Sequence, residues 1–268
     1  VWQWMDDLKL MRACHLNAVR PAHYPYAHAF YEACDRAGTL TLCEMPCWQL
    51  NERHFESASM REFACRYART MVEHYHNHPS IVLWNIQNES ATFHPSAPAF
   101  FESIDSTFRS LDPSRLTMTA ESPKPPEHLA VVKSVEKAPS GEPPRTHGFV
   151  DVFGINNYAG WYANKAAYLP QLLDHVAARI PDKPLLLSEF GAEGLAGVRT
   201  LELDHYSEAY QAELICHHMR AVLERPAMAG FFLWLFIDYR CSSIGVADIN
   251  HKGLVDEYRR PKLAFYRV

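Results

Sequence analysis

The sequence predicts an α/β fold with a parallel sheet, because strand-like apolar runs alternate with amphipathic, helix-like segments along all 268 residues. The length agrees, since a single α/β barrel typically needs about 250 residues. There is no internal repeat and no low-complexity tract, so residues 1–268 are expected to form one domain. An open, doubly wound sheet and a closed (β/α)8 barrel both fit this alternation.

Seven short apolar runs are the expected strands. They lie at residues 18–20, 39–45, 81–86, 116–120, 150–156, 184–188 and 229–236. A (β/α)8 barrel needs eight strands. A helix is expected over about residues 6–14, and no strand is visible before it. A barrel of this sequence is therefore expected to have its first strand missing or truncated at the N-terminus.

Helices are expected between these strands, where apolar residues recur at helical spacing. They span 27–37, 60–75, 98–111, 169–180 and 206–222, and a last helical segment begins near Pro261. Gly38, Pro79 and Pro113 are stop signals, because glycine favours a helix C-terminus and proline restricts the residue before it. Residues 122–147 are rich in Pro, Lys and Glu and are expected to form an exposed loop.

Composition excludes several classes of function. The net charge is -5 with no basic run, which argues against nucleic acid as a partner. No apolar run approaches the roughly 20 residues that cross a membrane. No glycine-rich phosphate loop is present, so no nucleotide cofactor is expected. The seven cysteines are scattered, which favours reduced, packed thiols and a cytoplasmic location.

The ends of the expected strands carry the residues suited to chemistry. Barrel enzymes place catalytic groups at C-terminal strand ends, and Glu89 and Glu189 each follow an apolar run. A glutamate at the end of one strand, taken alone, is as often a solvated or ion-paired residue as a catalytic one. Two strand-end carboxylates on one cavity, however, are able to divide the hydrolysis of a glycosidic bond between them.

Amides and aromatic rings accompany the two carboxylates, and this mixture suits a sugar. Amides bind hydroxyl groups, whereas indole rings stack on the apolar face of a pyranose. Simple packing is the alternative for His23, Tyr158, Tyr162 and Trp234. The candidate sugar-binding residues at the strand ends are Asn88, Arg20, His23, Asn156, Tyr158, Trp161, Tyr162 and Trp234.

A metal site is the alternative that the histidines raise. His74, His76 and His78 alternate at an expected helix end, where cationic side chains favour the helix dipole. Structural zinc sites use cysteine and histidine at set spacings, and Cys43 and Cys47 have no second cysteine pair. No metal is therefore expected, and a metal-dependent hydrolase is kept as a rival hypothesis.

Four segments, at residues 17–25, 77–90, 183–192 and 231–238, resemble motifs of glycoside hydrolase family 2, the β-galactosidase and β-glucuronidase family, in the same order. The resemblance implies a (β/α)8 TIM barrel that releases a terminal β-linked sugar with retention of configuration. It implies that Glu89 is the acid/base and Glu189 the nucleophile. It also implies that Asn88 contacts the sugar 2-hydroxyl. A raised pKa is expected for Glu89, and Glu189 must stay ionised.

The same resemblance bears on the sugar. Residues 156–162 resemble the Tyr-Gly-Trp-Tyr region of β-glucuronidases, and Asn250 and Lys252 resemble their Asn-x-Lys element, which contacts the uronic carboxylate. Asn-x-Lys-Gly also occurs in β-galactosidase-like members. Val246 stands where the glucuronidases have an arginine, and Cys43 replaces the aspartate of an Asp-Glu pair. Both substrate types therefore stay open.

The family also implies partners. Its enzymes carry β-sandwich domains before the barrel, and none is visible in residues 1–268. The rival to an active enzyme is therefore a non-catalytic carbohydrate-binding barrel or an inactive fragment of a larger glycosidase. Carbohydrate is the expected ligand. The expected protein partners are a second copy of the chain or the sandwich domains.

Overall fold

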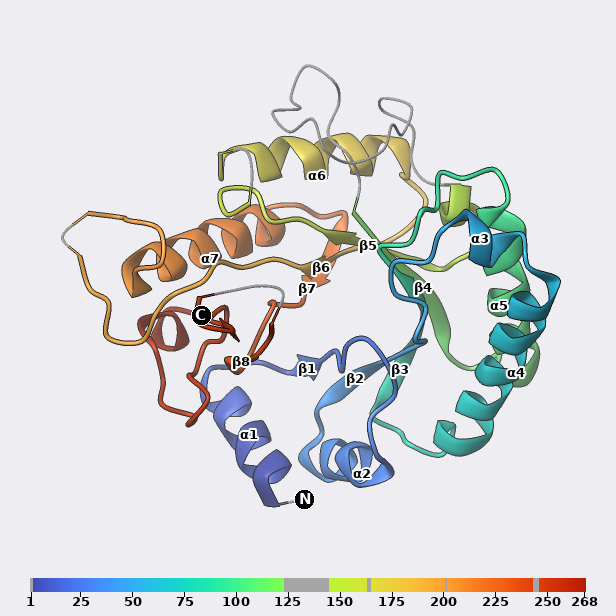
Figure 1. Ribbon diagram of the computed structural model, residues 1–268, viewed down its shortest axis with the longest axis horizontal. Coiled ribbons are helices and arrows are strands. Elements are labelled where there is room, and N and C mark those ends of the chain that lie inside the picture. The colour runs from blue at the N-terminus through green and yellow to red at the C-terminus, as the bar shows by residue number, and fades with distance from the viewer. Residues whose placement is uncertain (1, 123–144, 163–164, 201, 243–245) are drawn as a thin grey trace.

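The computed structural model contains one curled parallel sheet with helices on its outer side (Figure 1). It describes residues 2–122, 145–162, 165–200, 202–242 and 246–268. Seven strands follow one another in chain order: β1 (Ala18–Val19), β2 (Leu40–Glu44), β3 (Ile81–Asn88), β4 (Leu116–Glu121), β5 (Val152–Asn156), β6 (Leu185–Glu189) and β7 (Met228–Phe231). Every neighbouring pair is parallel, which is the arrangement that helical crossovers produce.

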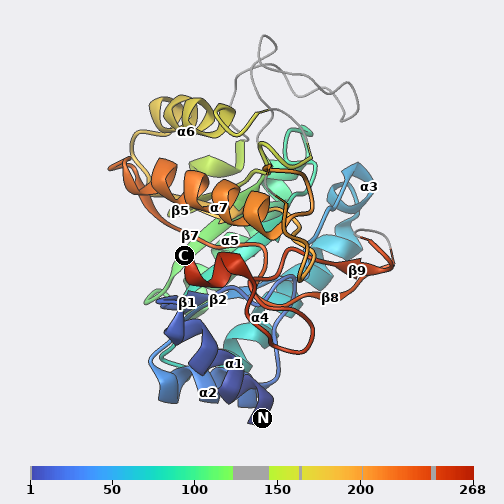
Figure 2. The same ribbon diagram turned by 90° about the vertical axis from the view of Figure 1, so that its left-hand side faces the viewer.

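The helices precede β1 or lie between the strands, at the expected positions except for the short helix Glu52–Phe55, which was not predicted. They are α1 (Trp2–Ala13), α2 (His28–Ala37), α3 (Glu52–Phe55), α4 (Ala58–Tyr75), α5 (Ala97–Leu111), α6 (Tyr168–Arg179) and α7 (Glu208–Leu223). Within the described ranges, two 3-10 turns follow, η2 (Arg145–Gly148) and η3 (Leu263–Tyr266), and Figure 2 shows η3 against α7. No helix in the described part of the chain is both long and apolar enough to cross a membrane.

The order of the strands confirms the expected barrel that lacks its first strand. β1 pairs with β2 and β7 pairs with β6, and no described strand lies between β1 and β7. α1 precedes β1, so the first described strand corresponds to the second strand of an eight-stranded barrel. A doubly wound sheet is excluded, because the strand order never reverses.

The core has an inner and an outer layer. Inside the curl, five consecutive strands contribute one apolar side chain each: Leu42, Leu83, Met118, Val152 and Leu186. Such a layer of bulky apolar residues is what fills a barrel interior. Outside, buried aromatic residues join the sheet to the helices, as where Trp84 stacks on Phe108 at 5.2 Å between ring centres. The rigid sheet that results supports the ends of its strands.

Three local predictions need correction. The run 229–236 is not one strand: β7 ends at Phe231, and the chain from Leu235 pairs instead with residues 252–255. The helix at 206–222 begins at Glu208, because Ser207 caps it by accepting a hydrogen bond from the Tyr210 amide. The last helical segment is a 3-10 turn.

Other elements lay outside the prediction. The short helix α3 and the hairpin of β8 (Tyr239–Arg240) and β9 (Ile249–Asn250) have too few residues to show a period in the sequence. Most of the predicted loop at 122–147 lies outside the described residues. Cys14, Cys34, Cys43 and Cys47 are buried as reduced thiols, which agrees with their expected packing role.

Candidate active site

Polar side chains from different strands meet at the C-terminal edge of the sheet. Arg20 follows β1, Glu44 ends β2, Asn88 ends β3, Asn156 ends β5 and Glu189 ends β6. The ladder between β5 and β6 pairs Asn156 directly with Glu189. Parallel strands bring all their carboxyl ends to one side, so residues up to 169 positions apart meet here.

Arg20 joins these strands. Its guanidinium donates to Glu44 Oε2 at 2.6 Å, to Glu189 Oε1 at 2.9 Å and to Asn88 Oδ1 at 2.7 Å. It also donates to the Ser188 carbonyl at 2.9 Å. The side chain is only 3% exposed, so these charges interact without much screening by water. The rigid fork of arginine carries five donors and so serves four acceptors at once, which the compact ammonium group of a lysine cannot do.

Glu44 is the second centre of this network. Besides Arg20, it accepts hydrogen bonds from Asn85 Nδ2 at 2.9 Å and from His23 Nδ1 at 2.8 Å. Burial alone would raise the pKa of Glu44, but Arg20 and His23 outweigh burial and hold that pKa below its ordinary value. Glu44 therefore stays ionised and fixes both the arginine and the imidazole.

Glu189 lies deep in the site and has two donors. Tyr158 donates its hydroxyl to Glu189 Oε2 at 2.9 Å, opposite the oxygen that Arg20 holds. Burial raises the pKa of Glu189 above its ordinary value, Arg20 opposes that rise, and the nearby charge of Glu89 adds to it. Burial and Glu189 together raise the pKa of Tyr158, which therefore keeps its proton and remains a donor.

Glu89 lies directly after β3 and is partly exposed. Asn156 Nδ2 donates to its Oε1 at 3.1 Å, and Gln49 Nε2 donates to its Oε2 at 3.4 Å. The backbone φ of Glu89 is 49°, in the left-handed region that a residue with a side chain rarely adopts. Such local strain is tolerated where the surroundings hold it, and it occurs often at functional sites.

Glu89 and Glu189 line the same cavity of about 1010 Å³, together with aromatic rings. His23 stacks on Trp234 at 5.2 Å and on Trp48 at 5.7 Å between ring centres. Tyr158 and Tyr162 also line the cavity, with ring centres 5.2 Å apart. The structure thus brings the predicted pair of glutamates and most of the predicted rings around one space, and Asn156 contacts Glu89 at its edge.

Asn250 and Lys252 lie differently from the residues above. Asn250 is buried and lines the cavity. Lys252 is fully buried, and its Nζ lies 3.3 Å from Glu193 Oε1 and 4.9 Å from the centre of the Tyr162 ring. Burial lowers the pKa of Lys252, and Glu193 opposes that fall. Trp161 is also buried, 5.6 Å from the same Nζ, and packs against Ala192 and Leu214.

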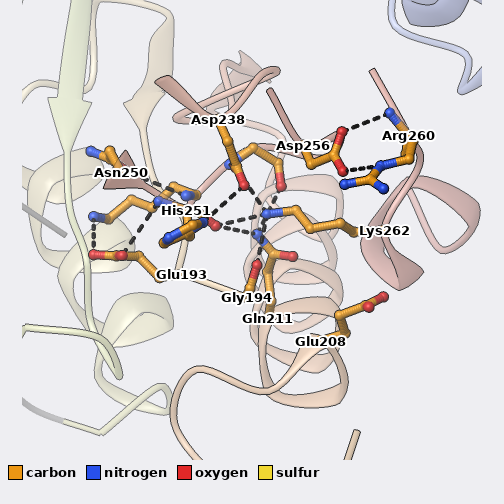
Figure 3. A network of polar contacts seen from close by, with 12 residues as sticks. Glu193, Gly194, Glu208, Gln211, Asp238, Asn250, His251, Asp256, Arg260 and Lys262 are labelled. Carbon is orange, nitrogen blue, oxygen red and sulfur yellow. Dashed lines mark hydrogen bonds and ion pairs between the residues drawn. The ribbon is translucent and has the colours of Figure 1, made fainter. Parts of the chain in front are cut away.

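A second polar network holds the segment that carries Asn250 and Lys252 (Figure 3). The buried Lys262 Nζ donates to Asp238 Oδ1 at 2.9 Å and to the carbonyls of Gly194 and His251 at 2.8 Å. His251 Nδ1 lies 3.1 Å from the other oxygen of Asp238. The segment after β9 is thereby tied to the chain that follows Glu189, which fixes its place beside the cavity.

The histidines at the end of α4 contact other groups of the fold. His74 and His76 donate from Nδ1 to carbonyls one turn back in their own helix, and His78 contacts Asp35 at 2.7 Å. Within the ranges that the structure describes, no group of three or more His, Cys, Asp or Glu residues is placed to hold a metal ion.

Sequence reasoning missed several residues of the site. Glu44, Trp48, Gln49, Ser188 and Glu193 all touch predicted site residues, yet none was a candidate. Glu44 ends β2 and Ser188 stands directly before the last residue of β6, so both lie at a strand end, where the same positional signal was present. Trp48, Gln49 and Glu193 lie in loops, where no period marks the direction of a side chain.

This fold is that of a known family. Residues 2–268 match the family described as glycosyl hydrolases family 2, TIM barrel domain. The chain belongs to this family.

Named relatives refine the comparison. The chain is 27% identical over 278 residues to a β-glucuronidase of Paenibacillus borealis, with 97% of this chain and 44% of that protein covered. It is 28% identical over 271 residues to the human β-glucuronidase, with 98% and 39% covered. The chain thus spans less than half the length of these curated relatives.

Solved structures agree. A family 2 β-galacturonidase from Eisenbergiella tayi bound to galacturonate matches with a TM-score of 0.85 and 29% identity, covering 99% of this chain and 46% of that one. A β-glucuronidase of Faecalibacterium prausnitzii matches with a TM-score of 0.85 and 29% identity, covering 99% and 44%.

Proposed function

We propose that this chain is the catalytic barrel of a retaining exo-β-glycosidase, with Glu189 as nucleophile and Glu89 as acid/base. One observation carries the proposal: a buried carboxylate held by Arg20 and Tyr158 shares a cavity with a second, partly exposed carboxyl group. Two carboxyl groups with different surroundings are what a double displacement at an anomeric carbon requires.

The chemistry follows from these surroundings. Glu189 attacks the anomeric carbon while Glu89 gives its proton to the leaving oxygen, and a glycosyl-enzyme ester forms. Glu89 then takes a proton from water, and that water releases the sugar with its original configuration. Arg20 and Tyr158 hold both oxygens of Glu189, which fixes the direction of attack. Asn156 orients Glu89 in the same way.

Asn88 is suited to bind the sugar 2-hydroxyl. Its Oδ1 accepts hydrogen bonds from Arg20 and Asn156, whereas its buried Nδ2 has no partner among the described residues. A buried donor without a partner costs free energy unless a ligand pairs with it. Hydrogen bonds to the 2-hydroxyl strengthen in the transition state, so Asn88 contributes where the reaction is slowest.

We infer that the terminal sugar is a β-linked uronic acid. The relatives named above are β-glucuronidases and a β-galacturonidase. Lys252 supplies a positive charge over the face of the Tyr162 ring, and that ring lines the cavity together with Asn250. Glu193 already pairs with this lysine, so a substrate carboxylate shares or replaces that partner. A panel of nitrophenyl β-glucuronide, β-galacturonide, β-galactoside and β-glucoside tests the assignment, and preference for a neutral sugar would contradict it.

Variants of the two glutamates test the mechanism. Glu189→Ala and Glu89→Ala should each lower kcat/KM for the best nitrophenyl glycoside by roughly a thousandfold or more. Added azide distinguishes the roles: it should give the α-glycosyl azide with Glu189→Ala and the β-glycosyl azide with Glu89→Ala. Glu102→Ala, on the outer helix α5, is the matched control. Sugar binding without turnover would favour the carbohydrate-binding barrel instead.

A further inference from the structure

Trp48 is an exposed indole ring at the mouth of the catalytic cavity. It lines that cavity with Glu89 and Gln49, and 52% of its surface is exposed. A single exposed apolar ring is common on a protein surface, but this indole lies in a cavity beside another stacked ring, where the flat face of a ligand is able to stack on it. One ring, His23, stacks on Trp48 with an interplanar angle of 10°.

The backbone places Trp48 on the acid/base side of the cavity. The amide of Gln49 donates to the Asn88 carbonyl at 2.8 Å, and the Asn88 amide donates to the Cys47 carbonyl at 2.9 Å. These two hydrogen bonds lock residues 47–49 beside the end of β3, one residue before Glu89. Gln49 also reaches the Glu89 carboxyl group directly.

The stacked rings run from the nucleophile side to the acid/base side. Trp234, which stacks on one end of this group, donates its amide to the carbonyl of Phe190, the neighbour of Glu189. His23 stacks on both indole rings. Its orientation is fixed by Glu44, whose Oε1 lies 2.8 Å from His23 Nδ1. In the row Trp234, His23, Trp48, the Trp48 ring is therefore the one beside Glu89.

This position has a chemical meaning. The acid/base protonates the oxygen that joins the sugar to its leaving group, so it stands at the boundary between the two. We propose that Trp48 is the platform of the leaving-group subsite, on which a flat apolar ring face stacks. The inference rests on the proposed function. An aryl group and a pyranose ring both offer such a face.

The platform is preformed. The Leu50 amide donates to Ser90 Oγ at 3.1 Å, and the Ala91 amide donates to the Leu50 carbonyl at 2.7 Å. Together with the backbone hydrogen bonds of Gln49 and Asn88, these two bonds tie residues 47–50 to the chain just before and just after Glu89. A ring held in place before binding loses little conformational entropy when the ligand arrives.

Non-hydrolysable thioglycosides test the platform separately from catalysis. The probes are methyl 1-thio-β-glucuronide, phenyl 1-thio-β-glucuronide and a thio-linked disaccharide with a terminal β-glucuronide. The matching β-galactosides are used if the nitrophenyl panel selects that sugar. Dissociation constants are measured by calorimetry for the wild type, Trp48→Ala, Trp48→Met and Trp48→Phe. Trp48→Met keeps apolar bulk without a ring, whereas Trp48→Phe keeps a ring.

The expected result is a change in selectivity. Trp48→Ala and Trp48→Met should reduce the preference for the ring-bearing probe over the methyl probe by about 10-fold, and Trp48→Phe should retain most of it. If the preference for the phenyl probe is lost, the leaving group is an aryl group. If the preference for the disaccharide is lost, the leaving group is a sugar. Trp2→Ala removes another exposed tryptophan, which lies outside the lining of the cavity. It should leave the dissociation constants of all three probes unchanged.

Two outcomes would overturn the inference. In the first, Trp48→Ala weakens the binding of the methyl probe and of the ring-bearing probes equally. In the second, Trp48→Ala prefers the ring-bearing probes over the methyl probe as strongly as the wild type does. Failure of every nitrophenyl glycoside to react, with ring selectivity still lost in Trp48→Ala, would reject the proposed catalytic function and leave the platform standing. Absence of binding by all probes would reject the platform as well.

Discussion

Replacing Arg20 with lysine will show how much the guanidinium contributes to the reactivity of Glu189. Arginine donates to Glu44, Asn88, Ser188 and Glu189 at once, whereas an ammonium group on a flexible stem cannot reach all four. Glu44 holds the shorter bond, at 2.6 Å against 2.9 Å for Glu189, so the lysine should stay with Glu44. Glu189 then loses one charge-assisted hydrogen bond in a buried place.

The magnitude follows from that lost bond. A hydrogen bond to a charged group contributes about 1.5–3 kcal/mol, and a pKa unit corresponds to about 1.4 kcal/mol. Arg20 favours the ionised form of Glu189, so weakening it raises the pKa of Glu189 further, by about 1–2 units. The nucleophile must be ionised, and the acid limb of kcat/KM should therefore move to higher pH by that amount.

The assay is the pH profile of kcat/KM with the preferred nitrophenyl β-glycoside. Tyr158→Phe removes the other donor to Glu189 and should move the same limb in the same direction. Arg115→Lys is the matched control, because Arg115 also donates several partly buried hydrogen bonds but lies before β4, at the opposite end of the sheet. An acid limb that stays at the wild-type pH in Arg20→Lys would refute the reasoning.

Three further predictions concern the supports of the site. Gly154→Ala should lower kcat/KM about 10-fold or more, since the new Cβ would lie 2.6 Å from the Thr119 carbonyl oxygen and 2.8 Å from Ser188 Oγ, which holds Asn156. Phe101→Ala should lower the free energy of unfolding in urea by about 3–5 kcal/mol, because the ring is fully buried; a change below about 1 kcal/mol would contradict its core role. Although burial opposes it, hydrogen bonds from Ser80 and His78 hold the pKa of Asp35 below its ordinary value. Asp35→Asn should therefore destabilise the protein near neutral pH, and the deficit should shrink as the pH falls through that pKa in urea titrations.

The alternation of strands and helices was predictable because it depends on local periods. Six of the seven predicted strands overlap their observed positions closely, and the seventh ends early, at Phe231. That run is apolar throughout, so its period did not show where the chain leaves the sheet to pair with residues 252–255. The hairpin of β8 and β9 escaped prediction for the opposite reason, since two-residue strands have no period.

The candidate site was predictable in part. Glu89 and Glu189 stood out because each ends an apolar run, and the resemblance to family 2 assigned their roles. Glu44 has the same signal, yet its importance lies in partners that a one-dimensional pattern does not show. Lys252 was expected beside a sugar carboxylate, and the structure shows it buried against Glu193.

The sequence by itself determined which residues end the strands, and therefore which side chains gather at the carboxyl edge of a parallel sheet. That information is local, since it depends on apolar runs and on the residues that interrupt them. Only the tertiary structure decided which of these side chains touch: that Arg20 joins Glu44 to Glu189, that Trp48 stays open beside Glu89, and that Lys252 pairs with Glu193. The physical reason is that such contacts depend on the register and curl of the whole sheet, which set distances between residues far apart in the chain.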